Sequence, residues 1–453
     1  MSQPPVDVDV RGIAAGGAGV ADLPDGRVIF VPRTTAGDRA RVHVEKSRPR
    51  WARGSLVTLL EASPERVDAP CTRYAECGGC QLQHLAYEDQ LKWKGRFVVD
   101  ALTRIGGLED VVAPEVIPSP KRLHYRNRVS YTLRRVGKGH VVAGFHALHR
   151  PAHVVDIRHE CLLPEKRLTE AWVLLRERWG RQAEHLPTAG RMRLTLRLAG
   201  PDRGDVDLVV EGGRPGWNGL PLFEAVAGLR AIWHMPVDKE GEPAVGESHD
   251  RATTKVGTLL VAGSPEESHA PAFSQVNDDA AEALRTYVLE CCLGSGSPGV
   301  EVSDTRSAVD AYCGTGAYGL SLAAKGWQVT GIESDPVAAA HARASVTTEN
   351  TSMPGRLDVR EGRVEDLLTS LLPTDLLLLN PPRGGLAEDV PTQVLEHPPG
   401  RIVYVSCDPA TLARDLKRLN DHYALDGIRS FDLFPQTAHV ETVAELSLRS
   451  TIA

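Results

Sequence analysis

The sequence predicts an α/β protein: an open, doubly wound parallel sheet in the C-terminal part, preceded by a region built mostly of strands. From Ser307 onward, short apolar strands alternate with helical stretches, which is typical of a parallel sheet covered by helices on both faces. Before that point, apolar and polar residues alternate between glycine-containing turns, as in short, half-buried strands.

The composition is that of a globular chain, with 453 residues, 42% hydrophobic and 25% charged. It excludes a disordered chain, a collagen-like fibre and a small disulfide scaffold. No apolar stretch approaches the roughly 20 residues that a membrane helix needs. The N-terminus has neither the basic segment nor the apolar core of a secretion signal. We therefore expect a cytoplasmic monomer with no membrane partner.

Residues 1–66 are predicted to form a small five-stranded β-barrel. Alternating stretches at 6–10, 27–31 and 39–44 supply its strands, and Gly-Gly and Asp-Gly pairs supply its turns. Barrels of this OB-like kind commonly bind oligonucleotides, although a generic small β-domain has the same pattern.

Residues 67–265 are predicted to form a central, mostly-β domain. A helix over 85–105 is expected to pack on the catalytic domain, and a second helix lies near 169–182. The chain carries a net charge of −7, yet residues 91–135 hold ten Lys or Arg and four acids, a local charge of +6. This local excess fits a nucleic-acid surface or an ordinary solvated face.

The central region begins with clustered cysteines. Cys71, Cys77 and Cys80 form the pattern Cys-x5-Cys-Gly-Gly-Cys, and Cys161 is the best candidate for a fourth ligand. Cysteines are reduced in the cytoplasm, so clustering indicates metal binding or catalysis rather than disulfides. Four thiolates suit zinc or an iron–sulfur cluster.

Residues 266–453 contain the predicted doubly wound sheet. A strand over 308–312 leads into Gly314-Thr315-Gly316, and a second strand over 329–332 ends in Glu333. An acid at that place can accept both ribose hydroxyls of an adenosine cofactor. Gly319 completes a Gly-x-Gly-x-x-Gly spacing, so the spacing alone is also compatible with NAD as the cofactor. Asp310 and the later motifs favour S-adenosylmethionine.

Two further strands end in reactive residues. The strand over 376–379 runs into Asn380-Pro381-Pro382-Arg383, where the asparagine can take the substrate or the cofactor. The strand over 402–405 is followed by Cys407 and a helix, and we expect the helix start to stabilise a thiolate there. Taken alone, Cys407 fits a buried structural role and Glu441 that of an ordinary strand acid.

Together these motifs resemble the S-adenosylmethionine-dependent RNA uracil-5-methyltransferase family over nearly the whole chain. The barrel resembles the family's TRAM domain, and the C-terminal domain its Rossmann-like class I methyltransferase domain. The cysteines, with the Cys-Gly-Gly-Cys-x-x-Gln-His run at 77–84, resemble its [4Fe–4S] site, which leaves zinc as the less favoured occupant.

The resemblance also implies roles for single residues. The segment 273–277 and the strand ends imply cofactor binding by Gln275, Tyr312, Glu333 and Asn380. The motifs at 406–415 and 434–441 imply that Cys407 is the nucleophile and Glu441 the base. The implied reaction is methyl transfer to C5 of a uridine in structured RNA through a cysteine–C6 adduct. The RNA is 23S rRNA in preference to tRNA.

One departure stands against this resemblance. The family's usual Asp-Pro-Pro-Arg is Asn380-Pro381-Pro382-Arg383 here, so a carboxylate near the cofactor or the uracil edge is lost. An amide still accepts a hydrogen bond but brings no charge. Two alternatives therefore remain: an RNA methyltransferase acting on an exocyclic amine, which needs no Cys407, and a non-catalytic RNA-binding protein.

Overall fold

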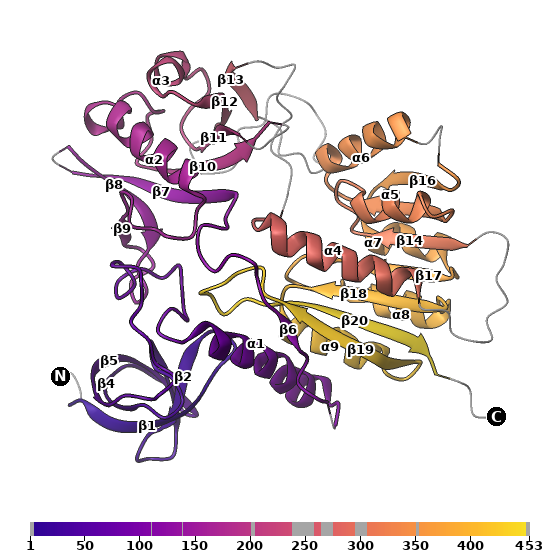
Figure 1. Cartoon of the computed structure of the whole chain (residues 1–453), viewed down its shortest axis with the longest axis horizontal. Coiled ribbons are helices and arrows are strands. Elements are labelled where there is room, and N and C mark those ends of the chain that lie inside the picture. Colours follow the sequence, from indigo (N-terminus) through magenta and orange to yellow (C-terminus); the bar gives the residue numbers. More distant parts are fainter. Residues whose placement is uncertain are drawn as a thin grey trace. The chain divides into compact units, whose positions relative to one another are not determined.

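In the computed structural model, the described residues form two compact units (Figure 1). The description covers residues 4–109, 111–137, 139–200, 204–237, 258–263, 275–294, 306–349 and 353–449. The first unit contains Met1–Gln90, Lys121–Asp278 and Pro435–Ala438, and the second contains Leu91–Pro120, Asp279–Phe434 and His439–Ala453. Neither unit is one continuous stretch of chain. The boundaries at residues 66 and 265 stay a prediction.

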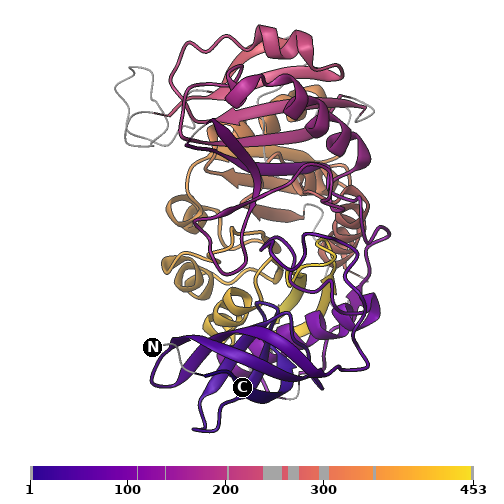
Figure 2. The same ribbon diagram turned by 90° about the vertical axis from the view of Figure 1, so that its left-hand side faces the viewer.

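The first unit begins with a closed five-stranded barrel (Figure 2, indigo). Its strand order is β1-β2-β3-β5-β4. The strands are β1 (Val6–Ile13), β2 (Ala18–Asp22), β3 (Val28–Pro32), β4 (Arg39–Ser47) and β5 (Trp51–Glu61). Every second side chain, such as Val8, Ile29 and Val42, fills the interior, as the alternating pattern predicts.

The rest of the first unit is a seven-stranded sheet in the order β13-β12-β11-β10-β7-β8-β9. Helices α2 and α3 pack against its inner face, where Trp172 stacks on Tyr131 at 4.0 Å between ring centroids. The elements are β7 (Arg128–Val136), β8 (His140–His146), β9 (Val154–Asp156), α2 (Lys166–Arg178), η2 (Arg181–Ala183), β10 (Arg191–Ala199), β11 (Asp205–Glu211), α3 (Leu220–Ala225), β12 (Leu229–Met235) and β13 (Leu259–Gly263).

The second unit is built on an eight-stranded sheet in the order β16-β15-β14-β17-β18-β20-β19-β6. Strands β14 to β18 run parallel, and β20 pairs antiparallel with β18. The strands are β6 (Val116–Ile117), β14 (Ser307–Ala311), β15 (Gln328–Glu333), β16 (Arg356–Glu361), β17 (Leu376–Leu379), β18 (Arg401–Ser406), β19 (Tyr423–Phe431) and β20 (Glu441–Leu448). The predicted doubly wound fold is thus confirmed.

Helices cover both faces of this sheet. In β17, Leu376 and Leu378 join the core on one face, while Leu377 and Leu379 join the core on the other. Helices α4 to α6 pack on the first face, and α1, η1 and α7 to α9 on the second. The helices are α1 (Tyr87–Ala101), η1 (Leu102–Gly106), α4 (Asp278–Leu293), α5 (Ala317–Ala323), α6 (Pro336–Glu349), α7 (Val364–Leu367), η3 (Leu368–Leu371), α8 (Asp389–Glu396) and α9 (Pro409–Leu419). Among the described residues, no helix has the length and hydrophobicity to cross a bilayer.

Candidate active site

The carboxyl ends of β14 and β17 mark the point where the strand order of the large sheet reverses. In open α/β sheets, ligands bind at this point. Tyr312 directly follows β14 and Asn380 directly follows β17. The Asn380 N–H donates to the carbonyl oxygen of Ala311 at 3.3 Å. These two predicted cofactor residues therefore lie at the same edge of the sheet.

The turn after β14 has an unusual backbone. Tyr312, Gly314 and Gly316 have φ angles of 66°, 57° and 80°. A tyrosine in this left-handed region costs about 1–3 kcal/mol, and such residues cluster at ligand sites. The Gly314 N–H donates to Glu333 Oε2 at 2.9 Å, and the Asp335 N–H donates to Glu333 Oε1 at 2.7 Å. Both bonds orient the carboxylate and leave it lone pairs for ribose hydroxyls.

Asp310, in strand β14 just before the same turn, is fully buried. Its Oδ2 accepts the Gly319 N–H at 3.0 Å, whereas its Oδ1 has no hydrogen-bond partner among the described residues. Burial, with a smaller contribution from the charge of Glu333, raises the pKa of Asp310 to about 7. A buried acceptor without a partner is costly. The turn therefore fits a ligand that completes it, as an adenosine cofactor would.

The fourth predicted cofactor residue, Gln275, belongs to the first unit. Its carbonyl oxygen accepts the side-chain amide of Asn127 at 2.8 Å, and the Asn127 N–H donates to the Val276 carbonyl at 2.9 Å. Two other residues of its motif, Phe273 and Ser274, lie outside the described residues. The contact of Gln275 with a cofactor stays a prediction.

Strand register brings the predicted nucleophile and base together. Ser406 pairs with Thr442 across β18 and β20, so Cys407 and Glu441 are the next opposite residues. On its other side, Glu441 pairs with Phe431 of β19. Glu441 is 5% exposed and Cys407 is half-buried. Two residues separated by 34 positions in the sequence thus become neighbours.

A third residue, Arg383, acts on both groups electrostatically. Burial raises the pKa of Glu441 to about 7, and the charge of Arg383 opposes this rise. Burial and the charge of Glu441 raise the pKa of the Cys407 thiol to about 11, and the charge of Arg383 again opposes this rise. The sequence motif contains Arg383 but does not by itself indicate a role for it. Its signal was a cation directly after the two prolines that end a buried strand.

The environment of Cys407 differs from one expectation. The start of α9 was expected to stabilise a thiolate, but the pKa of Cys407 is raised. Asp408 caps this helix instead, because its Oδ1 accepts the N–H groups of Ala410 at 2.9 Å and Thr411 at 3.0 Å. These donors, which would otherwise favour a thiolate, are already satisfied by a carboxylate.

A buried carboxylate that the sequence analysis did not single out holds the loop after Arg383. Asp415 Oδ2 accepts the Leu386 N–H at 2.9 Å and the Tyr404 hydroxyl at 2.8 Å. The neighbouring Arg414 donates to the Gly384 carbonyl at 2.8 Å. Helix α9 therefore fixes the loop between Arg383 and Leu386.

The four predicted metal ligands gather in the first unit. Cys71, Cys80 and Cys161 pack in one cluster with Tyr125 and Leu163. Burial raises the pKa of Cys80 to about 11 and that of Cys161 to about 12, and neighbouring thiols add to both shifts. The Gly79 N–H donates to Cys77 Sγ at 3.3 Å. Within the described ranges, however, no three Cys, His, Asp or Glu side chains form a ready metal site.

Arginines surround this cysteine loop. The Arg126 guanidinium interacts electrostatically with Cys80 and Cys161, which suits thiolates that carry negative charge. Arg33 of the barrel donates to the backbone carbonyls of Tyr74, Cys77 and Cys80, each at 2.6 Å. The donor set of four thiols with adjacent cations fits a thiolate-bound metal group.

Comparison with known proteins decides the family. The family described as tRNA (Uracil-5-)-methyltransferase matches residues 269–449, and the TRAM domain matches residues 5–57. An RNA methyltransferase of Nostoc sp., named uncharacterized, is 33% identical, with 98% of this chain and 96% of the relative covered. One of Halalkalibacterium halodurans, named likewise, is 30% identical, with 98% and 97% covered.

This chain belongs to the RNA uracil-5-methyltransferase family. Its fold is similar to the crystal structure of the Pyrococcus abyssi tRNA (uracil-54, C5)-methyltransferase in complex with S-adenosyl-L-homocysteine. The TM-score is 0.70 at 27% identity, with 97% of this chain and 100% of that chain covered. The barrel is thus the TRAM domain, and the eight-stranded sheet is that of an S-adenosylmethionine-dependent methyltransferase.

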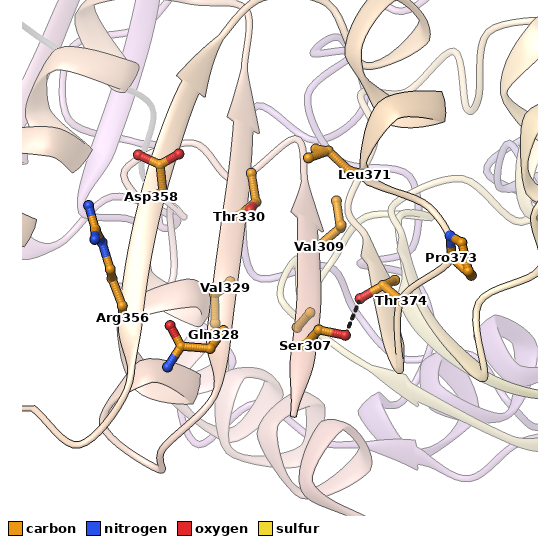
Figure 3. A pocket seen from close by; sticks show the side chains of 11 residues that line it. Ser307, Val309, Gln328, Val329, Thr330, Arg356, Asp358, Leu371, Pro373 and Thr374 are labelled. Carbon is orange, nitrogen blue, oxygen red and sulfur yellow. Dashed lines mark hydrogen bonds between the residues drawn. The ribbon is translucent and has the colours of Figure 1, made fainter. Parts of the chain in front are cut away.

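A pocket of about 240 Å³ in the methyltransferase sheet does not coincide with these residues (Figure 3). It lies where β14, β15 and β16 begin, at the edge opposite to Tyr312 and Asn380. Its lining includes Ser307, Gln328 and Thr374. Because ligands of this fold bind at the carboxyl ends of the strands, we assign this pocket no part in catalysis.

Proposed function

We propose that this chain transfers a methyl group from S-adenosylmethionine to C5 of a uridine in structured RNA, through a covalent adduct between Cys407 and C6. The observation that supports this most is the proximity of a thiol directly after β18 to a buried carboxyl group at the start of β20, with Arg383 in electrostatic reach of both. Uracil C5 is a poor nucleophile, so the reaction requires one thiol and one base with separate tasks.

In this mechanism, the Cys407 thiolate adds to C6 and places electron density on C5. The cofactor would supply an electrophilic methyl group: C5 would bond to this methyl as the methyl–sulfur bond breaks, and the sulfur would keep that electron pair as a neutral thioether. Glu441 then removes the C5 proton, and the electron pair of that bond restores the double bond as the Cys407 sulfur leaves C6. Arg383 favours the charged forms of both residues, which their burial disfavours.

We propose that Tyr312, Glu333, Asn380 and Gln275 bind the cofactor. We also propose that Cys71, Cys77, Cys80 and Cys161 bind a [4Fe–4S] cluster. Four thiols, with the Arg126 guanidinium near Cys80 and Cys161, support this assignment, because thiolates are the usual ligands of such clusters. Uracil methylation transfers no electron, so the cluster is expected to be structural.

The outer face of the seven-stranded sheet supports RNA as the partner. We call Arg128, Arg134, Arg191 and Arg193 the arginine face. They lie on β7 and β10, opposite the core-facing Leu133 and Leu194. Arg134 is the direct cross-strand partner of Arg191. Like charges at such positions repel each other, and phosphate groups would relieve this repulsion. The TRAM barrel supplies further RNA surface.

The layout of a barrel with four cysteines favours 23S rRNA as the substrate, and the likeness to a tRNA enzyme makes tRNA the second candidate. Both candidate substrates can be tested by mass spectrometry of nucleosides. The rRNA and tRNA are isolated from cytoplasmic extracts of cells with and without this gene and are digested separately. Loss of 5-methyluridine from one pool, restored by the parent gene but not by Cys407→Ala, is the expected result.

Two results would contradict the proposal. If Cys407→Ala restored full methylation, Cys407 would not be the nucleophile. If 5-methyluridine were unchanged and a base methylated on an exocyclic amine were lost, Asn380 would mark an amine methyltransferase.

A further inference from the structure

A fully buried ion pair lies next to the segment that leads to Glu441. Lys94 of α1 and Asp432, which follows β19, both have side chains with 0% exposure. The Lys94 Nζ donates to Asp432 Oδ1 at 2.5 Å. Both residues belong to the second unit, and neither has a role in the chemistry proposed above.

The ion pair holds the backbone of one residue from both sides. The Lys94 Nζ donates to the carbonyl oxygen of Phe434 at 3.1 Å. Asp432 Oδ1 accepts the N–H of the same Phe434, also at 3.1 Å. The Asp432 N–H donates to the Ile117 carbonyl at 2.9 Å. The turn over 432–434 is therefore fixed to α1 and to β6.

This turn opens the loop that carries the proposed base. Phe431 and Glu441 are cross-strand partners, so residues 432–440 form a loop closed by that pair. Within the loop, the rings of Phe434 and His439 meet edge to face at 5.8 Å. The turn over 432–434 is thus linked to Glu441, which begins β20, by the chain of this loop and by the Phe431–Glu441 pair.

Packing alone does not require this ion pair. Burying two charges is costly, and apolar side chains of similar volume often hold two elements together as well or better. An ion pair differs from apolar contacts in being directional. Here its bonds reach the N–H and the C=O of a single loop residue, which fixes the backbone conformation and not only the distance between α1 and β19.

We infer that Lys94 and Asp432 are positioning residues for the base: by fixing the turn over 432–434, they place the Glu441 carboxylate for removal of the C5 proton. The inference rests on the proposed function. Loss of the pair would slow proton removal and release of the RNA, while addition of Cys407 and methyl transfer continue. Methylated RNA would then stay attached to the enzyme.

The double variant Lys94→Met/Asp432→Leu replaces the pair by apolar side chains and leaves no unpaired buried charge. It is compared, in the full chain, with the parent, with Glu441→Gln and with Arg176→Met. Arg176→Met is the control, because it breaks the Arg176–Asp156 ion pair of the first unit at 2.9 Å. The probe is rRNA and tRNA isolated from cells that lack this gene. The readouts are the thermal unfolding midpoint, cofactor affinity and the amount of denaturation-resistant RNA–protein adduct.

We expect the double variant to bind the cofactor like the parent and to release RNA on the order of tenfold to a hundredfold more slowly. Its adduct should contain 5-methyluridine, as that of Glu441→Gln should. Arg176→Met should lower the unfolding midpoint without accumulating adduct. Release at the parent rate by a folded double variant, or an adduct that contains only unmethylated uridine, would overturn the inference.

Two further results separate the inference from the proposed function. If the double variant does not fold, Lys94→Met/Asp432→Asn decides, because it also removes both charges and keeps the shape of the Asp432 side chain. The same slow release is then expected, and parent-like release refutes the positioning role. If Glu441→Gln accumulates no adduct, the assignment of the base fails, and the inference fails with it.

Discussion

At the scale of single residues, burial disfavours the charged forms of both reactive groups of the site. The pKa of Cys407 is raised to about 11 and that of Glu441 to about 7, in both cases mainly through burial. A neutral thiol and a half-protonated acid react poorly, so substrate binding and Arg383 must favour their charged forms. Burial of these groups therefore lowers the stability of the folded chain while serving the reaction, as is common in functional sites.

Because burial disfavours the ionised form of Glu441, we predict a pH-dependent gain in stability for Glu441→Gln. Between the ordinary pKa of 4.5 and about 7, the folded chain holds a proton that the unfolded chain releases, so stability falls as pH rises. Above pH 7, the ionised group costs up to about 3 kcal/mol. In urea unfolding, Glu441→Gln should therefore be more stable than the parent at pH 8 and equal to it at pH 4.5.

The exposed Glu396 supplies the control for this measurement. Glu396→Gln removes a carboxylate from the surface and should leave stability unchanged at both pH values. If Glu441→Gln behaved like Glu396→Gln, burial would not raise the free energy of the ionised base.

A second residue-scale prediction concerns Asn380. Restoring the family's carboxylate with Asn380→Asp should tighten S-adenosylmethionine binding by up to about tenfold, because a carboxylate makes a charge-assisted bond to the cofactor's ammonium group. Isothermal titration calorimetry measures this change. Weaker binding of the cofactor together with altered RNA methylation would place residue 380 at the uracil instead.

At the scale of elements, the sequence predicted the positions of the strands well. It did not predict which residues distant in the sequence lie close together in the fold. The predicted strand over 376–379 coincides with β17, and the strands predicted over 308–312 and 329–332 agree with β14 and β15 to within a residue or two. Buried parallel strands are continuous apolar runs, which makes them visible in a sequence. In contrast, the proximity of Cys407 to Glu441 depends on the β18–β20 register, which a single sequence does not encode locally.

Other features of the site were also beyond sequence patterns. Asp415 looked like one more acid on a helix, and only the tertiary fold brings Leu386 and Tyr404 to it. The helix start was expected to stabilise a Cys407 thiolate, whereas burial is the largest cause of a raised pKa there, and Asp408 caps the helix. Lys94 gave no signal, since a lysine in an amphipathic helix normally faces solvent.

One prediction belongs to the cysteine loop as an element. Cys161→Ser should abolish the broad brown absorbance of anaerobically purified protein and lower RNA affinity at least several-fold, while cofactor affinity stays within twofold of the parent. The reason is that the cysteine loop belongs to the first unit, whereas Tyr312, Glu333 and Asn380, three of the four proposed cofactor residues, belong to the second. Cys292→Ser, which changes a buried cysteine of α4, is the control and should retain the absorbance. Colourless parent protein that contains zinc would contradict the iron–sulfur assignment.

At the scale of the whole molecule, charge is distributed unevenly. The chain is acidic overall, at −7, yet the arginine face gathers cations on one side of one sheet. A local positive field of this kind attracts polyanions even when the net charge is negative. RNA binding should therefore be sensitive to salt.

The arginine face predicts a measurable change in that sensitivity. In a Cys407→Ala background, Arg191→Ala/Arg193→Ala should weaken RNA binding and reduce the slope of log affinity against log salt concentration by about 1.5 to 2, because two phosphate contacts are lost. Arg178→Ala, on helix α2 and likewise exposed, should leave the slope unchanged. An equal slope in the double variant would show that the arginine face does not contact phosphates.

The discontinuous composition of the two units has a consequence for biosynthesis. The first unit includes Pro435–Ala438, so a nascent chain cannot complete it until those residues have been translated. By then, nearly all of the second unit's segments have also been made. The first unit is completed at Ala438 and the second only at Ala453, so premature termination anywhere before residue 438 leaves both units unfinished. Such a chain would reach the cell's quality control with both units incomplete, and of the three sheets only the barrel of β1 to β5 has all its strands early in the sequence.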